Sequence, residues 1–243
     1  VIGASVESLV KHGRQTARQA IYGDLVKTGD FVFLTASDAL SAVDRKNPLG
    51  AIRSFLQTFP TEPGVRLVVK THSTANIVSS YEQGVWDVIR EICAADQRIV
   101  LLDRLLPDDA HYALIEGADC LVSLHRSEGL GYHILEAMQL GVPVIATSYS
   151  GPADFCSPET SFPCDYRLVH VEPHQYARAN AEQVWAEPDY SHAARQMLTV
   201  FYDRVASERV VTNARRLVDK DYSPAALSIR LALHLRALFD RHT

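Results

Sequence analysis

Residues 120–147 form a strand, a glycine loop, a helix and a second strand in close succession, and this unit constrains the fold most. Its apolar start predicts a buried strand, and apolar side chains at helical spacing follow over 132–140. Gly141 suits the left-handed end of a helix, and Pro143 prevents the helix from continuing. Residues 144–147 therefore begin another strand, and a helix between two apolar strands is typical of a parallel sheet.

The rest of the chain repeats this alternation of strand and helix. The continuous apolar runs predict strands at 31–34, 65–69, 99–102, 120–124 and 144–147. The helical patterns lie at 48–59, 77–95, 107–115, 132–140, 191–206 and 225–239. Strands that are apolar throughout are covered on both faces. The predicted fold class is therefore α/β, a Rossmann-like doubly wound parallel sheet with C-terminal helices.

Three parts are expected along the chain. Residues 1–29 show a moderate helical pattern and are interpreted as a leading segment or linker. Residues 30–190 form the sheet domain, and helices within 191–243 pack on it. Between 155 and 188 the sequence predicts irregular structure with one strand at 167–171.

Composition excludes several classes of function. The net charge is −5 and there is no lysine- or arginine-rich block, so nucleic acid is not an expected partner. No apolar run approaches the length of a membrane span, and the start does not resemble a signal peptide. The four cysteines form no Cys-x-x-Cys pair, which indicates a reduced cytoplasmic setting and no zinc site. The first residue is not methionine, so the chain is expected to be a piece of a longer protein.

Ligands of such sheets bind in the loops that follow the strands, close to the point where strand order reverses. The loop from Glu128 to Gly131 precedes a helix, whose free N–H groups and dipole suit an anion such as a diphosphate. The spacing is not Gly-x-Gly-x-x-Gly, so the dinucleotide fingerprint is absent. A tight turn without a ligand is the alternative for these glycines.

Charged residues near these strand ends have two interpretations each. Glu136 could accept hydrogen bonds from vicinal ribose hydroxyls, or be an exposed helix glutamate. Arg45 and Lys46 could neutralise a diphosphate, or form a solvated pair before a helix. Lys70 could point into the same crevice, or lie on the surface. His125 and His133 flank the glycine loop, and either a sugar contact or a structural role would suit them.

A family resemblance adds to this reading. Ser-Glu-Gly-Leu-Gly at 127–131, Glu-Ala-Met at 136–138 and Leu-Gly-Val-Pro-Val-Ile-Ala-Thr at 140–147 resemble the signature of retaining glycosyltransferases of the GT-B fold. The matching family is the one with the Glu-x7-Glu motif and a "group 1" C-terminal domain. Arg-Lys-Asn-Pro at 45–48 resembles the start of that domain's first helix. Trp-Ala-Glu-Pro-Asp at 185–189 is similar to a segment of bacterial polysaccharide mannosyltransferases.

The resemblance implies one half of a GT-B fold, the half that binds a nucleotide sugar such as GDP-mannose or a UDP-sugar. It implies a hexosyltransferase that transfers with retention and needs no metal. A glycan or lipid-linked acceptor would bind a missing N-terminal domain, in the cytoplasm or peripherally at the inner membrane. The catalytic residues would be Glu128, at the donor sugar, and Lys46, at the diphosphate. The other donor contacts would come from Arg45, Lys70, Leu105 near the base, the backbone of Gly129, Leu130 and Gly131, and Glu136 at the ribose.

The chain departs from the family pattern in three places. The first strand is followed by Thr-Ala-Ser-Asp at 35–38, where many members have Gly-Arg, so Arg45 or Lys70 would have to compensate. Ser-Gly-Pro-Ala-Asp at 150–154 replaces the Gly-Gly and glutamate of many members. An acceptor domain of about 200 residues is absent from the chain. A degenerate donor-binding or assembly module, and another GT-B enzyme such as an epimerase or phosphorylase, therefore stay open as alternatives.

Overall fold

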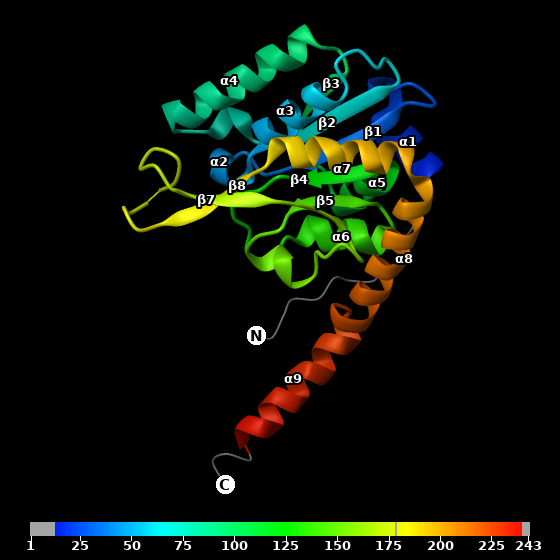
Figure 1. The fold of residues 1–243 in the computed structure, drawn as a ribbon, viewed down its shortest axis with the longest axis vertical. Coiled ribbons are helices and arrows are strands. Elements are labelled where there is room, and N and C mark those ends of the chain that lie inside the picture. Colours follow the sequence, from blue (N-terminus) through cyan, green and yellow to red (C-terminus); the bar gives the residue numbers. More distant parts are fainter. Residues whose placement is uncertain (1–12, 178, 240–243) are drawn as a thin grey trace.

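A six-stranded parallel sheet is the centre of the computed structural model, which describes residues 13–177 and 179–239 (Figure 1). Its strand order is β3-β2-β1-β4-β5-β6, so the order reverses between β1 and β4. The predicted α/β fold class is confirmed, and a ligand crevice is expected at this reversal. The strands are β1 (Phe31–Ala36), β2 (Val65–Thr71), β3 (Ile99–Asp103), β4 (Cys120–Ser123), β5 (Val144–Thr147) and β6 (Phe162–Cys164).

Helices cover both faces of the sheet because successive strand residues point to opposite sides. Phe33 faces one core, whereas its neighbours Val32 and Leu34 face the other. The first core is covered by α3 (Pro48–Thr58), α4 (Ser80–Ala95) and α7 (Tyr190–Tyr202). The second core is covered by α1 (Arg14–Tyr22), α5 (Asp108–Gly117), α6 (Tyr132–Leu140) and α8 (Arg204–Asp221).

Short helical turns occupy several of the connections. The connection after β1 ends in a helical turn, α2 (Val43–Lys46). Three 3-10 turns lie at η1 (Gly23–Leu25), η2 (Thr74–Asn76) and η3 (Gly151–Asp154). The turn α2 carries Arg45 and Lys46, the two cations that the sequence analysis placed at the candidate ligand site.

The strand predicted at 167–171 is confirmed as β7, but the expectation of otherwise irregular structure between 155 and 188 was wrong. This segment contains the edge strand β6 and an antiparallel pair, β7 (Tyr166–His170) with β8 (Val184–Pro188). The helix predicted at 191–206 ends at Tyr202, and α8 follows in a segment where the sequence predicted no helix. Strand β6 was not predicted because it contains Pro163, and proline disfavours a strand assignment. Proline is nevertheless tolerated at the edge of a sheet, where β6 lies.

The two ends of the described chain differ from the expected division. Residues 13–29 belong to the body of the domain, because Tyr22 is buried and its hydroxyl donates to the Leu114 carbonyl at 2.6 Å. The first twelve residues of the predicted leading segment lie outside the described residues, as do 240–243. The last helix, α9 (Pro224–Phe239), buries none of its residues, and Figure 1 shows it extending away from the sheet. Within the described chain, every helix is too short or too polar to cross a bilayer.

Candidate functional site

Asn47 fixes the helical turn α2 to the end of β4. Its backbone is left-handed, with φ 52°, so it ends α2 and begins α3 at a single residue. Its side-chain oxygen accepts from Gly50 N at 3.1 Å, and its amide nitrogen donates to the Leu124 carbonyl at 2.8 Å. Asparagine tolerates the left-handed region better than most residues. The loops after β1 and β4 are therefore joined at the point where the strand order reverses.

Two cations of the α2 turn face the glycine loop. The Lys46 ammonium is bonded to the Glu128 carboxylate, and Arg45 Nη1 lies 3.7 Å from the same carboxylate. Arg45 also donates to the Ser127 carbonyl at 3.0 Å. Burial by itself would raise the pKa of Glu128, but the hydrogen bond and charge of Lys46 outweigh burial and lower it. The positive charges of Arg45 and Lys46 thus face the single negative charge of Glu128. The net positive charge that results is favourable for binding an anion.

Arg126 holds the α2 turn from behind, and sequence reasoning missed it. Its backbone N–H donates to the Arg45 carbonyl at 2.8 Å, and its Nη1 lies 2.9 Å from the Asp44 carboxylate. Its Nε donates to Glu187 at 2.6 Å, and its guanidinium lies over the Trp185 ring. Residues 185–188 of the segment noted for its family resemblance lie in β8, and Trp185 and Glu187 in this strand support the α2 turn through Arg126.

The loop after β5 braces the glycine loop. The Glu128 N–H donates to Ser150 Oγ at 2.9 Å, and the Gly151 N–H donates to the Glu128 carbonyl at 3.2 Å. A Cβ at Gly151 would lie 1.7 Å from the Gly129 carbonyl oxygen, so only glycine fits there. Ser150 has φ 57° and ψ −148°, a conformation that non-glycine residues rarely adopt and that often marks functional loops. Gly131 then begins α6 with φ 82°, ahead of its free first-turn N–H groups.

A cavity of about 290 Å³ lies beside this loop, at the carboxyl ends of the strands. Sequence reasoning chose four of the residues that line it, Lys46, Lys70, Leu105 and Glu136. Glu128 does not line the cavity itself, but it is bonded to Lys46, which does. His133, for which the sequence left a sugar contact or a structural role open, also lines the cavity. So do residues that the sequence did not place in the site, which include His72, His111 and Tyr132. Histidines separated in sequence gave no spacing pattern that could have revealed them.

Glu136 and Lys70 are both partnered in the cavity wall. Glu136 Oε2 lies 3.1 Å from His111 Nε2, and its side chain is only 14% exposed. The alternative of an exposed helix glutamate is therefore wrong. Lys70 is 6% exposed and donates to the Thr71 carbonyl at 2.8 Å, so it is not a surface lysine. Burial lowers the pKa of Lys70, which makes an anionic partner favourable for its charged form.

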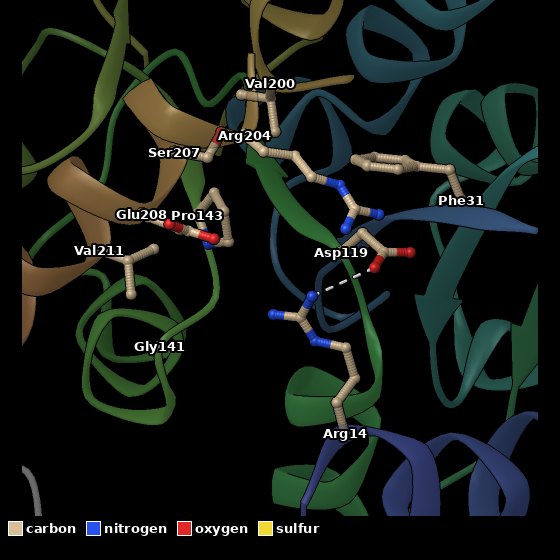
Figure 2. A pocket seen from close by; sticks show the side chains of 10 residues that line it. All are labelled: Arg14, Phe31, Asp119, Gly141, Pro143, Val200, Arg204, Ser207, Glu208 and Val211. Atoms are coloured by element: carbon tan, nitrogen blue, oxygen red, sulfur yellow. Dashed lines mark hydrogen bonds and ion pairs between the residues drawn. The ribbon is translucent and has the colours of Figure 1, made fainter. Parts of the chain in front are cut away.

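A second cavity, of about 200 Å³, lies at the opposite ends of the strands (Figure 2). Figure 2 shows Arg14 and Asp119 pointing toward one another in it, and their charged groups pair at 3.3 Å. Arg18 also pairs with Asp119, so these charges anchor α1 to the start of β4. Among the described residues, no group of three or more His, Cys, Asp or Glu side chains is arranged to hold a metal ion.

Comparison with known proteins locates this arrangement in one family. The sequence profile described as "Glycosyl transferases group 1" matches residues 62–184, half of the chain. No curated protein sequence gave a significant match. Among solved structures, the C-terminal domain of a glycosyl transferase group 1 family protein, LpcC from Francisella tularensis, is similar with a TM-score of 0.64. It is 17% identical, and the match covers 90% of this chain and 99% of that one.

Two larger structures share the same fold. HepE from Anabaena, in complex with UDP and glucose, matches with a TM-score of 0.69 and 16% identity, over 91% of this chain and 52% of HepE. A sucrose-phosphate synthase from Thermosynechococcus elongatus matches with a TM-score of 0.71 and 16% identity, over 99% of this chain and 52% of the synthase. The chain thus spans about half the length of these two proteins.

Proposed function

Because this chain belongs to the group 1 glycosyl transferases, we propose that it is the donor-binding part of a retaining hexosyltransferase. The observation that carries the proposal is the meeting of Lys46 and Arg45 with the glycine loop across the β1–β4 crevice. That crevice adjoins a cavity and the N-terminus of α6, which together suit an anionic ligand with an organic part.

Each part of a nucleotide sugar has a proposed partner. Lys46, Arg45 and Lys70 neutralise the diphosphate, and the backbone N–H groups of 129–131 contact the diphosphate and the sugar. Glu136, held by His111, accepts hydrogen bonds from the ribose hydroxyls. Leu105, whose side chain is 74% exposed at the cavity rim, packs against the base.

In the proposed reaction the bond from the sugar's anomeric carbon to the diphosphate oxygen breaks, and a bond to an acceptor hydroxyl oxygen forms. The acceptor proton passes to an oxygen of the leaving diphosphate, so the charges balance. Lys46 and Arg45 stabilise the negative charge that develops on the leaving group, because cations act most strongly where charge appears. Glu128 lies where it could stabilise positive charge on the sugar.

The acceptor belongs to the part of the enzyme beyond this chain. Since the chain spans about half of HepE and the synthase, we propose that the other half binds a glycan or lipid-linked acceptor. This would place the full enzyme in the cytoplasm, peripherally at the inner membrane. HepE was solved with UDP and glucose, which makes UDP-glucose the first donor to test here, and the resemblance at 185–189 makes GDP-mannose the second.

Isothermal titration of the chain with UDP, GDP and ADP, and with UDP-glucose, GDP-mannose and ADP-glucose, tests the proposal. At least one nucleotide should bind, and Glu136→Ala should weaken it about tenfold or more through lost hydrogen bonds. Glu91→Ala is the matched control, since Glu91 is an exposed glutamate on α4. Absence of binding to all six compounds would instead favour a degenerate assembly module.

A further inference from the structure

A series of hydrogen bonds connects the backbone carbonyl of Tyr149 to His133 through His125 and Ser123. His125 Nε2 lies 3.2 Å from the Tyr149 carbonyl oxygen, and His125 Nδ1 lies 3.0 Å from Ser123 Oγ. Ser123 Oγ in turn lies 3.3 Å from His133 Nε2. His125 and Ser123 are buried at the end of β4, whereas His133 is half-buried and lines the cavity.

The direction of every hydrogen bond in this chain follows from its fixed end. A carbonyl can only accept, so His125 Nε2 carries a proton and donates it to Tyr149. Burial lowers the pKa of His125 and keeps the ring neutral, so its Nδ1 is bare and accepts from the Ser123 hydroxyl. The single hydroxyl proton of Ser123 is therefore used in the hydrogen bond to His125. Toward His133, the Ser123 oxygen can only accept a hydrogen bond. His133 Nε2 must therefore carry a proton.

His133 is neutral as well. It lies in the first turn of α6, where the positive end of the helix dipole disfavours an imidazolium. Burial and the neighbouring charge of Lys46 lower the pKa of His133 to about 3. A neutral ring with its proton on Nε2 has an unprotonated Nδ1, and this nitrogen is a hydrogen-bond acceptor on a side chain that lines the cavity.

We propose that Nδ1 of His133 accepts a hydrogen bond from a hydroxyl group of the sugar to be transferred, an inference that rests on the proposed donor site. An imidazole lone pair repels the diphosphate oxygens and attracts an O–H group. The donor molecule has hydroxyls on its ribose and its hexose, and Glu136 with His111 accounts for the ribose. The charges that act most strongly on His133 are those of Lys46 and Glu128, the two residues placed at the diphosphate and the hexose.

The first test measures the tautomer directly. Imidazole ¹⁵N spectra of the ligand-free chain should show His133 as the neutral Nε2–H tautomer at pH 7 and still at pH 5. The Ser123→Ala variant should lose this single tautomer, because the hydroxyl that selects it is gone. An imidazolium, or the Nδ1–H tautomer, in the unsubstituted chain would overturn the inference.

The second test compares a nucleotide sugar with its parent nucleotide. UDP-glucose with UDP, GDP-mannose with GDP, or ADP-glucose with ADP is used, according to which pair the unsubstituted chain binds. His133→Ala should weaken the sugar nucleotide about fivefold to tenfold and change the parent nucleotide less than about twofold. His133→Asn should recover part of the loss, since its side-chain oxygen can occupy the position of Nδ1.

The outcomes separate this inference from the proposed function. If His133→Ala weakens both compounds equally, or neither, the hydroxyl contact is refuted while the donor site stands. If the unsubstituted chain binds none of these pairs, the donor site itself fails and the contact fails with it. Retained binding of the parent nucleotide shows that a variant is folded, and the ¹⁵N measurement does not depend on any His133 variant.

Discussion

The ammonium group of Lys46 is bonded to the carboxylate of Glu128, and this contact joins the loop after β1 to the loop after β4. The pair has a consequence for binding. In the proposed donor site, a diphosphate would meet a cation already bonded to Glu128, so the two anions would share Lys46 or exchange it. Arg45 Nη1 lies 3.7 Å from the Glu128 carboxylate, so Arg45 would be the second cation for this carboxylate if Lys46 bound the diphosphate.

The two members of this pair should respond to substitution in opposite directions. Lys46→Met removes the cation, and we expect nucleoside diphosphate affinity to fall about tenfold or more. Glu128→Gln frees Lys46, so the affinity for the same nucleotide should stay equal or rise, while donor turnover by the full enzyme falls. Titration of both variants with UDP and GDP measures this. Equal weakening by both substitutions would show that the pair is only a structural link.

Gly151 should be intolerant of any side chain. Gly151→Ala places a Cβ 1.7 Å from the Gly129 carbonyl oxygen, so the two loops must separate. We expect a loss of about 1–3 kcal/mol in the free energy of unfolding, and weaker nucleotide binding. Gly84→Ala, within helix α4 and with nothing within 4 Å of the added Cβ, is the control and should stabilise by about 0.5–1 kcal/mol. Urea denaturation measures the free energy of unfolding of both variants. Equal stability of the two variants would contradict the close approach of Gly151 to the Gly129 carbonyl oxygen.

Arg126 should matter to the site without contacting the donor. Arg126→Met leaves Asp44 and Glu187 without their buried partner, and we expect a loss of about 3–5 kcal/mol in the free energy of unfolding. Arg90→Met breaks the exposed pair with Asp87 and should cost about 1 kcal/mol or less. Thermal unfolding measures the Tm of both variants. A similar decrease in Tm for both would show that the buried ion pairs of Arg126 contribute no more than an exposed pair.

The neutral state of His133 predicts how stability depends on pH. Its pKa falls from 6.5 to about 3 on folding, so between these values the unfolded chain binds a proton that the folded chain does not. The free energy of unfolding should therefore fall as pH falls through this window, by up to about 1.4 kcal/mol per pH unit. The groups that act on this ring are Lys46, Glu128, His125 and His111.

Substitution should isolate this contribution. In His133→Asn the slope between pH 6.5 and 5 should be shallower by about one proton, as measured by urea denaturation at each pH. The window stays above the range in which Glu128, whose pKa is also lowered, takes up a proton. Glu128→Gln is the control and should keep the slope. An unchanged slope in His133→Asn would show that the ring is already protonated or freely solvated.

The sequence was enough to predict those strands of the sheet that consist mostly of apolar residues. The apolar run Phe31–Leu34, and Val65–Val69 with its single Arg66, were predicted as buried strands, and both lie in the sheet as predicted. Strand β6 escaped prediction because it is short, contains Pro163 and lies at the edge. Helix α8 escaped because its buried side consists of a narrow stripe, Val210, Ala214 and Val218, in an otherwise polar segment.

The site divides in the same way. Local spacing was enough to predict that Gly131 begins a helix and that Glu136 lies on it. The strand-end rule was enough to place Lys46 and Lys70 near that loop, although their roles in binding stay predictions. The pairing of His111 with Glu136, the hydrogen bonds that fix His133 and the Arg126 clamp depend on side-chain contacts between distant elements. No spacing in one sequence reports such contacts.

The reversal of strand order between β1 and β4 also fixes when the site can exist during folding. Lys46 and Glu128 are 82 positions apart, and they meet only after β4 has paired beside β1. A nascent chain that ends before β4 already has Lys46 and Lys70, yet it has no glycine loop to oppose them. Contacts of this sequence separation form late and slowly. In the proposed donor site, nucleotide binding would require the two halves of the sheet to have joined, and a fluorescent nucleotide could time that event during refolding.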